Sequence, residues 1–258
     1  MSMTIRDLTN RLEVFSNPKW ACDWDNVGLH IGDYDGCVNS ILLTVDVDDA
    51  AIKMALDNKI DMIISHHPFF FKGVKKLNSD TIEGRRTMKL ISNGIAVYCM
   101  HTNFDCSHMA FEAAERMGIT GASVLEEMGE GYGIGAIGNL KSETELGKVC
   151  KDVKSRFNID TVAFYGNEKD LIKRVAICPG SGKDEIGLAV KKGADLIITG
   201  DVSYHFGIDG VADGIDIIDA GHYGIEHIFM DIVKNYFKNE IGGIKVMTMP
   251  LSNPQKYI

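Results

Sequence analysis

The pattern of apolar and polar positions predicts strands that alternate with helices along the first half of the chain. Short apolar runs at 41–47, 61–65 and 95–100 are typical of buried strands. Between these runs, helical stretches are expected over 49–58 and 81–93. Strands that alternate with helices in this way form βαβ units on a mostly parallel sheet.

The chain is expected to open with a helix. Thr4 and Asp7 resemble a capping box, apolar residues recur at helical spacing up to Phe15, and Asn17-Pro18 is expected to end the helix. Residues 20–29, rich in Trp, Asp and Asn, then read as a loop. Such a loop either lines a site or is held against the core by its two tryptophans.

The second half of the chain begins with a change in composition, after which predicted strands again alternate with predicted helices. The glycine-dense stretch 126–138 predicts a domain boundary near 121–131. Strands are expected at 134–140, 160–165, 175–178, 215–218 and 244–249, and helices at 107–117, 143–157, 184–192 and 223–238.

A weak internal duplication relates the two halves. Residues 194–201 closely resemble residues 59–66, because each segment has an Asp, a short apolar run, a small polar residue and then a potential ligand. The preceding helices, 49–58 and 184–192, also correspond. The sequence therefore predicts two similar α/β domains with mostly parallel sheets.

The length of 258 residues leaves room for these two domains. The first is predicted to comprise residues 1–125, completed by the C-terminal segment 220–258. The second is predicted to comprise residues 126–219.

Composition and charge narrow the class of protein. The hydrophobic fraction is 45% and the charged fraction 24%, as in soluble globular proteins. Acidic residues outnumber basic ones by 36 to 27, which gives a net charge of -9 and opposes binding to nucleic-acid backbones. A small anionic substrate stays compatible with this balance, since local fields differ from the total.

The cysteines and the apolar runs indicate the compartment. The six cysteines form no C-x-x-C pair, so neither a zinc ribbon nor a redox dithiol is indicated, and scattered cysteines in apolar runs suit a reducing compartment. We identify no signal peptide and no apolar run long enough to cross a bilayer, so no membrane partner is expected. The expected location is the cytoplasm.

Candidate chemistry begins with His66 and His67, which directly follow a predicted strand. Imidazole is a metal ligand and a base near neutral pH. For this pair alone, two histidines that cap a strand are the better interpretation. His101 and Asp105, however, follow the next strand, and in parallel sheets ligands gather beyond the carboxyl ends of the strands.

The second half supplies matching groups. His222 and Glu226 are four residues apart at a predicted helix start and so share one face, and Asp201 and His205 follow another strand. The glycine turn at 179–182 could hold an anion, although a tight strand-to-helix turn explains its glycines equally well.

These groups exceed the needs of a single zinc site. Four of the histidines, His66, His67, His101 and His222, together with the carboxylates of Asp105 and Glu226, are more than one tetrahedral ion requires. Two metal ions bridged by a carboxylate, with water completing the coordination, would use the surplus.

Five ordered motifs carry a family resemblance across nearly the whole chain. They are Trp24-Asp25-Asn26-Val27-Gly28-Leu29, Ser65-His66-His67-Pro68, His101-Thr102-Asn103-Phe104-Asp105, Gly200-Asp201 with His205, and Gly221-His222 with Glu226. Together they resemble the NGG1-interacting-factor-three-like family, whose members are often named GTP cyclohydrolase 1 type 2 homologues. The resemblance implies a dinuclear metal site in the cleft between two α/β domains, and a ring-shaped homohexamer.

Carried over to this chain, the resemblance implies a ligand set and several neighbouring groups. The implied metal ligands are His66, His67, Asp105, His222 and Glu226, with His101 at or beside the centre and the two carboxylates as candidate bridges. Asp201 and His205 would lie beside the metals, and Trp24 and Asp25 would help to wall the cleft. Mixed nitrogen and oxygen ligands suit two divalent ions of Zn, Fe, Mn, Co or Ni.

Two functional hypotheses follow. The first is a metal-dependent hydrolase that acts on a small molecule, in GTP cyclohydrolase fashion on the imidazole ring of a purine nucleotide, with His101 or His205 as the proton-transfer group. The alternative is a non-catalytic metal-binding or interaction protein with a ring-shaped scaffold. Nothing in the residues selects GTP over a phosphoester or an amide.

Overall fold

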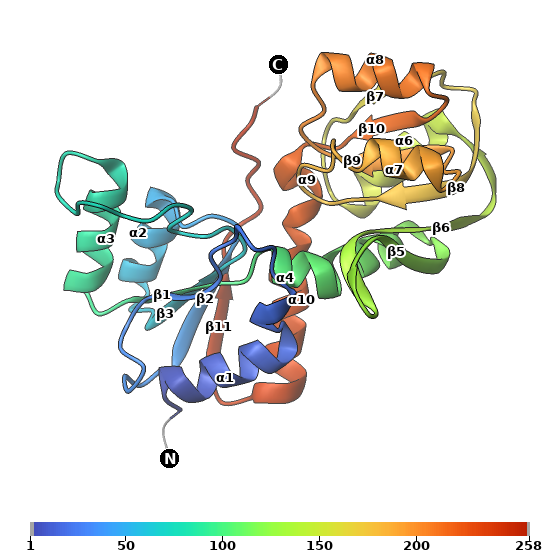
Figure 1. Ribbon diagram of the computed structural model, residues 1–258. Coiled ribbons are helices and arrows are strands. Elements are labelled where there is room, and N and C mark those ends of the chain that lie inside the picture. Colours follow the sequence, from blue (N-terminus) through green and yellow to red (C-terminus); the bar gives the residue numbers. More distant parts are fainter. Residues whose placement is uncertain (1–2, 257–258) are drawn as a thin grey trace. The chain divides into compact units, whose positions relative to one another are not determined.

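The computed structural model describes residues 3–256 and divides into two compact units. Of the described residues, the first unit comprises those up to Phe104 together with Phe229–Leu251, and the second comprises Asp105–Ile228 with those from Ser252 onward. Each unit contains one sheet with helices packed on it (Figure 1). The predicted fold class of two α/β domains is confirmed. The predicted boundaries at 125/126 and 219/220 stay predictions, since compactness does not show which segments fold independently.

The first unit is built on a five-stranded sheet in the order β1-β4-β3-β2-β11. All strands run parallel except β1, which is antiparallel to β4. In chain order its elements are α1 (Ile5–Phe15), η1 (Pro18–Trp20), β1 (Gly28–Ile31), β2 (Ser40–Thr44), α2 (Asp49–Asp57), β3 (Met62–Ser65), α3 (Ile82–Ser92), β4 (Ala96–Cys99), α4 (Thr102–Phe104), α10 (Ile228–Tyr236), η3 (Phe237–Ile241) and β11 (Lys245–Thr248).

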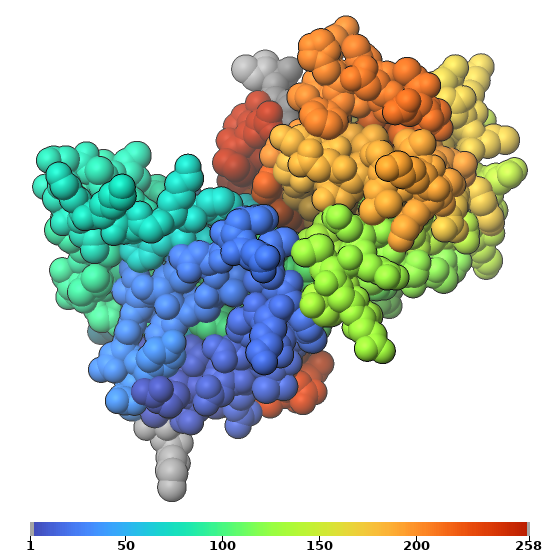
Figure 2. Space-filling view, in the orientation of Figure 1, coloured from blue at the N-terminus to red at the C-terminus, as the bar shows by residue number. Residues whose placement is uncertain are grey.

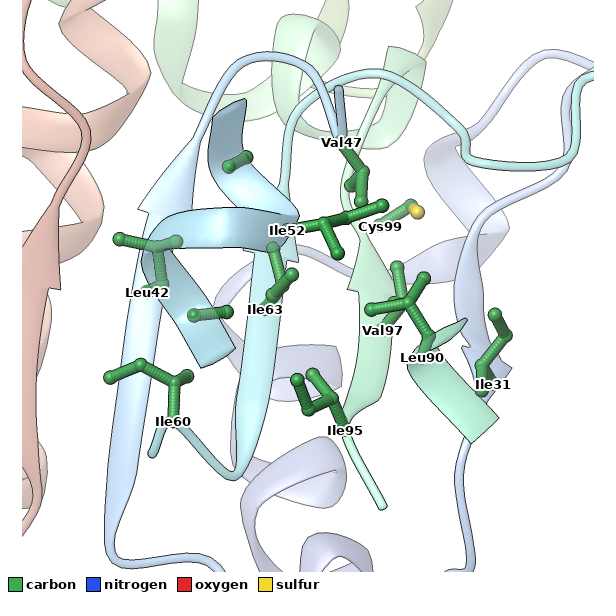
Figure 3. Close-up of a cluster of buried hydrophobic side chains, with 12 residues drawn as sticks. Ile31, Leu42, Val47, Ile52, Ile60, Ile63, Leu90, Ile95, Val97 and Cys99 are labelled. Carbon is green, nitrogen blue, oxygen red and sulfur yellow. The ribbon is translucent and has the colours of Figure 1, made fainter. Parts of the chain in front are cut away.

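Both faces of this sheet are buried, which explains the continuous apolar runs in the sequence. Alternate residues such as Leu42, Ile63 and Val97 point toward α2 and α3, where Ile52 and Leu90 pack against them (Figure 3). The helices α1 and α10 cover the opposite face (Figure 1). Because the parallel strands β2, β3 and β4 run in one direction, the residues that follow them meet at one edge of the sheet.

The first helix begins as the sequence predicts. Asp7 donates its backbone N–H to Thr4 Oγ1 at 3.1 Å, and Thr4 donates its backbone N–H to Asp7 Oδ2 at 3.2 Å. These reciprocal bonds satisfy two donors at the helix start. The helix ends at Phe15, before Asn17-Pro18.

The second unit is built on a six-stranded mixed sheet in the order β5-β6-β8-β9-β10-β7. The strands β8, β9 and β10 are parallel, and the pairs β5–β6, β6–β8 and β10–β7 are antiparallel. Its elements are η2 (Asp105–Met109), α5 (Ala110–Met117), β5 (Thr120–Gly129), β6 (Tyr132–Glu145), α6 (Leu146–Arg156), β7 (Ala163–Tyr165), β8 (Leu171–Ile177), α7 (Ile186–Lys191), β9 (Leu196–Thr199), α8 (Tyr204–Ala212), β10 (Asp216–Asp219) and α9 (His222–Glu226).

The duplicated segments occupy equivalent positions in the two sheets. Asp61, before β3, accepts the backbone N–H groups of Asn39 and Ser40 at 2.8 and 2.9 Å. Asp195, before β9, accepts those of Lys173 and Arg174 at 2.9 and 2.7 Å. Each aspartate thus ties the start of its strand to the neighbouring strand.

Some elements differ from the sequence prediction. The strands β1 and β5 and the helix α8 were not predicted, and the glycine-dense stretch forms the hairpin between β5 and β6. The helix predicted over 107–117 begins as the π-helical turn η2. The helix predicted over 223–238 is divided at His227 into α9 and α10. No helix of residues 3–256 has the length and apolar character that crossing a membrane requires.

Candidate metal centre

Three histidines gather at the carboxyl edge of the first sheet. His66 and His67 follow β3, and His101 follows β4 by two residues. One ring nitrogen from each lies within 4.8 Å of the others. Since metal–imidazole bonds are about 2.0–2.1 Å long, one ion could engage all three after small shifts. His66 has no solvent exposure, whereas His67 and His101 are partly exposed.

In His66 and His67 the same ring nitrogen, Nδ1, contacts an oxygen acceptor. His66 Nδ1 lies 2.9 Å from the carbonyl oxygen of Met100. His67 Nδ1 lies 2.8 Å from Asp46 Oδ1. Carbonyl and carboxylate oxygens only accept, so Nδ1 donates the proton in both rings, and Nε2 is the nitrogen on the other side of each ring. Metal-binding histidines in proteins are held in this way by a second partner.

Asp25 performs the same task for His101. Its Oδ1 accepts the Nδ1 proton of His101 at 2.9 Å, and its other oxygen accepts the N–H and hydroxyl of Thr102. Burial by itself raises the pKa of Asp25, yet the hydrogen bonds from His101 and Thr102 lower it to about 2. Asp25 is therefore ionised at neutral pH and holds the imidazole in one orientation.

A second pair of candidate ligands lies on α9 in the second unit. His222 Nδ1 lies 2.7 Å from Asp201 Oδ2, so this histidine also presents Nε2. His222 Nε2 faces Glu226 Oε2 at 3.1 Å, and Glu226 is only 3% exposed. Two ligands of one ion with bonds near 2.1 Å lie about 3 Å apart, so the spacing of this pair suits a shared ion.

The backbone around α9 makes room for this pair. Gly180, at φ +73°, lies so close to Glu226 that a Cβ atom there would stand 2.2 Å from Oε1. Asp201 adopts φ +56°, a left-handed conformation that is uncommon outside glycine. Gly180 therefore has a steric role beside Glu226, whereas a Cβ atom at Gly182 would meet Cys178 and Thr199.

The remaining predicted site residues lie elsewhere in the second unit. Asp105 is the first residue of η2 and is partly buried; π-helical turns are frequent at functional sites. His205 lies in the first turn of α8 and is exposed. Within the described part of the second unit, neither joins a group of three candidate ligands. His227 donates its Nε2 proton to the carbonyl of Phe157 at 2.7 Å, which is a structural role.

Two partners of the histidines were missed in the sequence. Asp46 holds His67, and the carbonyl of Met100 holds His66. Asp46 lies near the carboxyl end of the run 41–47 that was predicted as a strand, and this position alone does not show that it contacts His67. No sequence feature identifies a backbone carbonyl as a partner.

The fold and these residues define a class: a two-unit α/β protein with histidine and carboxylate groups able to hold a metal ion. The family is equally clear. The family model described as Duf34/NIF3 (NGG1p interacting factor 3) matches residues 3–254, and the chain belongs to this family. The resemblance seen in the five sequence motifs is confirmed.

Named relatives are similar to this chain over most of its length. The chain is 37% identical over 231 residues to the GTP cyclohydrolase 1 type 2 homolog of Clostridium acetobutylicum, covering 88% of this chain and 86% of the relative. It is 31% identical over 255 residues to that of Campylobacter jejuni, covering 99% and 100%.

Solved structures show the same fold. A crystal structure of a Staphylococcus aureus hypothetical protein matches with a TM-score of 0.92 and 29% identity, covering 100% of both chains. A Bacillus cereus protein related to NIF3 matches with a TM-score of 0.92 at 20% identity, covering 100% of this chain and 99% of the other, which supports the fold alone.

Proposed function

We propose that this protein is a metal-dependent hydrolase with a dinuclear centre that acts on a small molecule. The observation that carries the proposal is the state of four histidines, His66, His67, His101 and His222. In each, Nδ1 donates to an oxygen acceptor, and we propose that Nε2, on the other side of the ring, binds the metal. Three of those acceptors are carboxylates, which also strengthen the ligands.

The proposed ligands are His66, His67, Asp105, His222 and Glu226, with His101 at or beside the centre. Three imidazoles are enough for one ion, and a second ion would use the carboxylates and the remaining imidazole. We propose that the ligands of both units serve one centre, as the family resemblance implies. The nitrogen and oxygen donors suit Zn, Fe, Mn, Co or Ni, and contain no thiolate.

In this proposal the bound ions and the side chains of the protein have different tasks in the reaction. Two divalent ions, when bound, would lower the pKa of a water molecule and polarise the bond under attack. Asp25, Asp46 and Asp201 keep the imidazoles oriented throughout. His205, exposed and outside the groups of candidate ligands in its unit, is the histidine best suited to transfer a proton, and His101 is the other candidate.

The name shared by the relatives supports a nucleotide as substrate. In the proposed reaction, one water molecule opens the imidazole ring of a purine nucleotide at C8 to give a formamide, and a second water molecule hydrolyses the formamide to formate and an amine. A homohexamer and a cytoplasmic location belong to the same proposal. The exposed apolar side chains of α8, which include Tyr204, Ile208 and Val211, offer a surface for contact between subunits.

Turnover by the metal-loaded protein tests this proposal. The purified protein would be offered GTP, nucleotide phosphoesters and cyclic amides beside a His222→Ala, Glu226→Ala double variant. Loss of turnover in the double variant, by at least about a hundredfold, is expected, since metal ligands and their partners typically contribute that much. The control is Glu168→Ala, which removes an exposed carboxylate of the same unit and should retain full activity.

Absence of turnover on every substrate, with the metal fully bound, would contradict the hydrolase. That result would favour the alternative, in which the metals and the assembly serve a structural or binding role.

A further inference from the structure

Two large aromatic rings are exposed beside the histidine cluster of the first unit. Trp24 is 60% exposed and Phe71 is 54% exposed. Their ring centroids lie 5.8 Å apart with a 33° angle between the planes. Each ring also lies edge-on to His101, at 5.9 Å for Trp24 and 6.0 Å for Phe71. Rings of this size are usually buried, so an exposed pair beside a candidate metal ligand indicates a binding surface.

The backbone under these rings is firmly held. Asp25, next to Trp24, accepts hydrogen bonds from His101 and Thr102. Asn26 donates its Nδ2 proton to the carbonyl of Phe70 at 2.7 Å, which joins the two loops. Phe70 in turn donates its N–H to His30 Nδ1 at 3.2 Å. A ligand on the two rings would therefore find them in place, at little cost in conformational entropy.

The segment that follows Phe71 is basic in an otherwise acidic protein. Lys72, Lys75 and Lys76 are all exposed, and no Asp or Glu occurs between His66 and Ser79, although the chain carries a net charge of -9. This segment lies on the surface of the first unit, in the turquoise region of Figure 2. A local excess of positive charge raises the concentration of anions such as phosphates.

We propose that Trp24 and Phe71 form a stacking surface for the planar base of a nucleotide, and that the lysines of 72–76 bind its phosphates. This inference rests on the proposed function, because it names the substrate class of the same site. Aromatic rings alone would also suit an organic cation, but the adjacent lysines oppose one. A base with an attached phosphate satisfies both features, and stacking beside His101 brings the base to the candidate metal ligands.

Fluorescence of Trp24 tests the stacking. The chain has two tryptophans, Trp20 and Trp24, so a Trp20→Phe variant reports on Trp24 alone. GTP, read within seconds of mixing, should quench this fluorescence. Guanosine should quench it with an affinity at least about tenfold lower, because it lacks the phosphates. Inorganic triphosphate should bind without comparable quenching.

Substitutions separate the two parts of the surface. Phe71→Ala or Trp24→Ala should weaken GTP binding by about 5- to 150-fold, the range for losing one base–aromatic stack, and Trp24→Phe should restore most of it. Replacing Lys72, Lys75 and Lys76 by Gln should weaken GTP but leave guanosine unchanged. Phe164→Ala and Lys169→Gln, an exposed aromatic and an exposed lysine of the second unit, are the controls. Calorimetry measures binding in the variants that lack Trp24.

Equal affinities in the aromatic variants and the wild type would overturn the inference, as would a failure of any nucleotide to bind. Binding is measured apart from turnover, so the two proposals fail separately. Nucleotide binding that depends on Trp24 but is followed by no hydrolysis contradicts only the hydrolase. Turnover that is indifferent to Trp24 and Phe71 contradicts only the stacking surface.

Discussion

At the scale of single residues, the chemistry depends on the partner of each imidazole more than on the imidazole itself. A histidine that ends a strand is usually structural. His66, His67, His101 and His222 differ because an oxygen acceptor holds Nδ1 in each case. His227 differs from these four, because its Nε2 donates a hydrogen bond to the carbonyl of Phe157. The sequence identified the histidines, but their tautomers follow only from the structure.

Glu185 gives a prediction about pH. Burial, reinforced by the charges of Glu126 and Asp184, raises its pKa from 4.5 to about 7. The folded-state pKa lies above the unfolded value, so the folded protein holds this proton more tightly. The resulting stabilisation is complete below about pH 4.5 and is lost as the pH rises through 7.

The variant Glu185→Gln removes this titration. At pH 8 it should be more stable than the wild type by about 1 kcal/mol or more, or about 2–4 °C in Tm for each kcal/mol, because one pKa unit corresponds to about 1.4 kcal/mol. At pH 4.5 the two should melt together. Thermal melts across this range measure the difference, with Glu143→Gln as an exposed control. An equal shift at both pH values would refute the explanation.

At the scale of elements, the ends of the predicted strands were the feature that located the candidate ligands. The prediction that ligands gather after parallel strands placed His66, His67 and His101 correctly at one edge, because strand direction fixes where a strand ends. The duplication also has a physical basis, since Asp61 and Asp195 make matching bonds. The helix α8 escaped prediction because Gly207 and Gly210 interrupt it, and glycine disfavours helices.

Those glycines allow α8 to approach the sheet. A Cβ atom at Gly207 would lie 2.3 Å from the ring of Tyr165, and one at Gly210 would lie 2.7 Å from Ile217. The helix therefore packs its glycines inward and leaves side chains such as Tyr204 and Ile208 exposed. This arrangement reverses the usual amphipathic pattern, which is why apolar periodicity could not reveal it.

Gly207→Ala should destabilise the protein by about 1–3 kcal/mol through overpacking. The matched control is Gly187→Ala in α7, where a Cβ atom would have nothing within 4 Å. There the exchange should stabilise by about 0.5–1 kcal/mol, since alanine favours the helix interior. Denaturant unfolding measures both. A Gly207→Ala midpoint at or above that of the wild type would show that the close approach is unimportant.

At the scale of the whole molecule, most of the fold could be predicted from the sequence, but only part of the contacts at the candidate site could. Apolar runs that alternate with helical stretches predicted two α/β halves. The strand β11, near the end of the chain, pairs with β2 of the first unit. Antiparallel additions such as β5 were not accessible, because glycine-rich hairpins resemble loops. Asp46 was overlooked because one carboxylate after a strand carries no signal until its neighbour in the sheet is known.

The metal content of the purified protein tests the central claim most directly. After careful desalting, the wild type should retain about two divalent ions per chain. His66→Ala and His222→Ala, one variant from each unit, should each lose at least one of them. The control His227→Gln, which keeps a hydrogen-bond donor for Phe157, should retain both. Fewer than one ion per folded wild-type chain would contradict the dinuclear centre, as would full occupancy in the His66→Ala and His222→Ala variants.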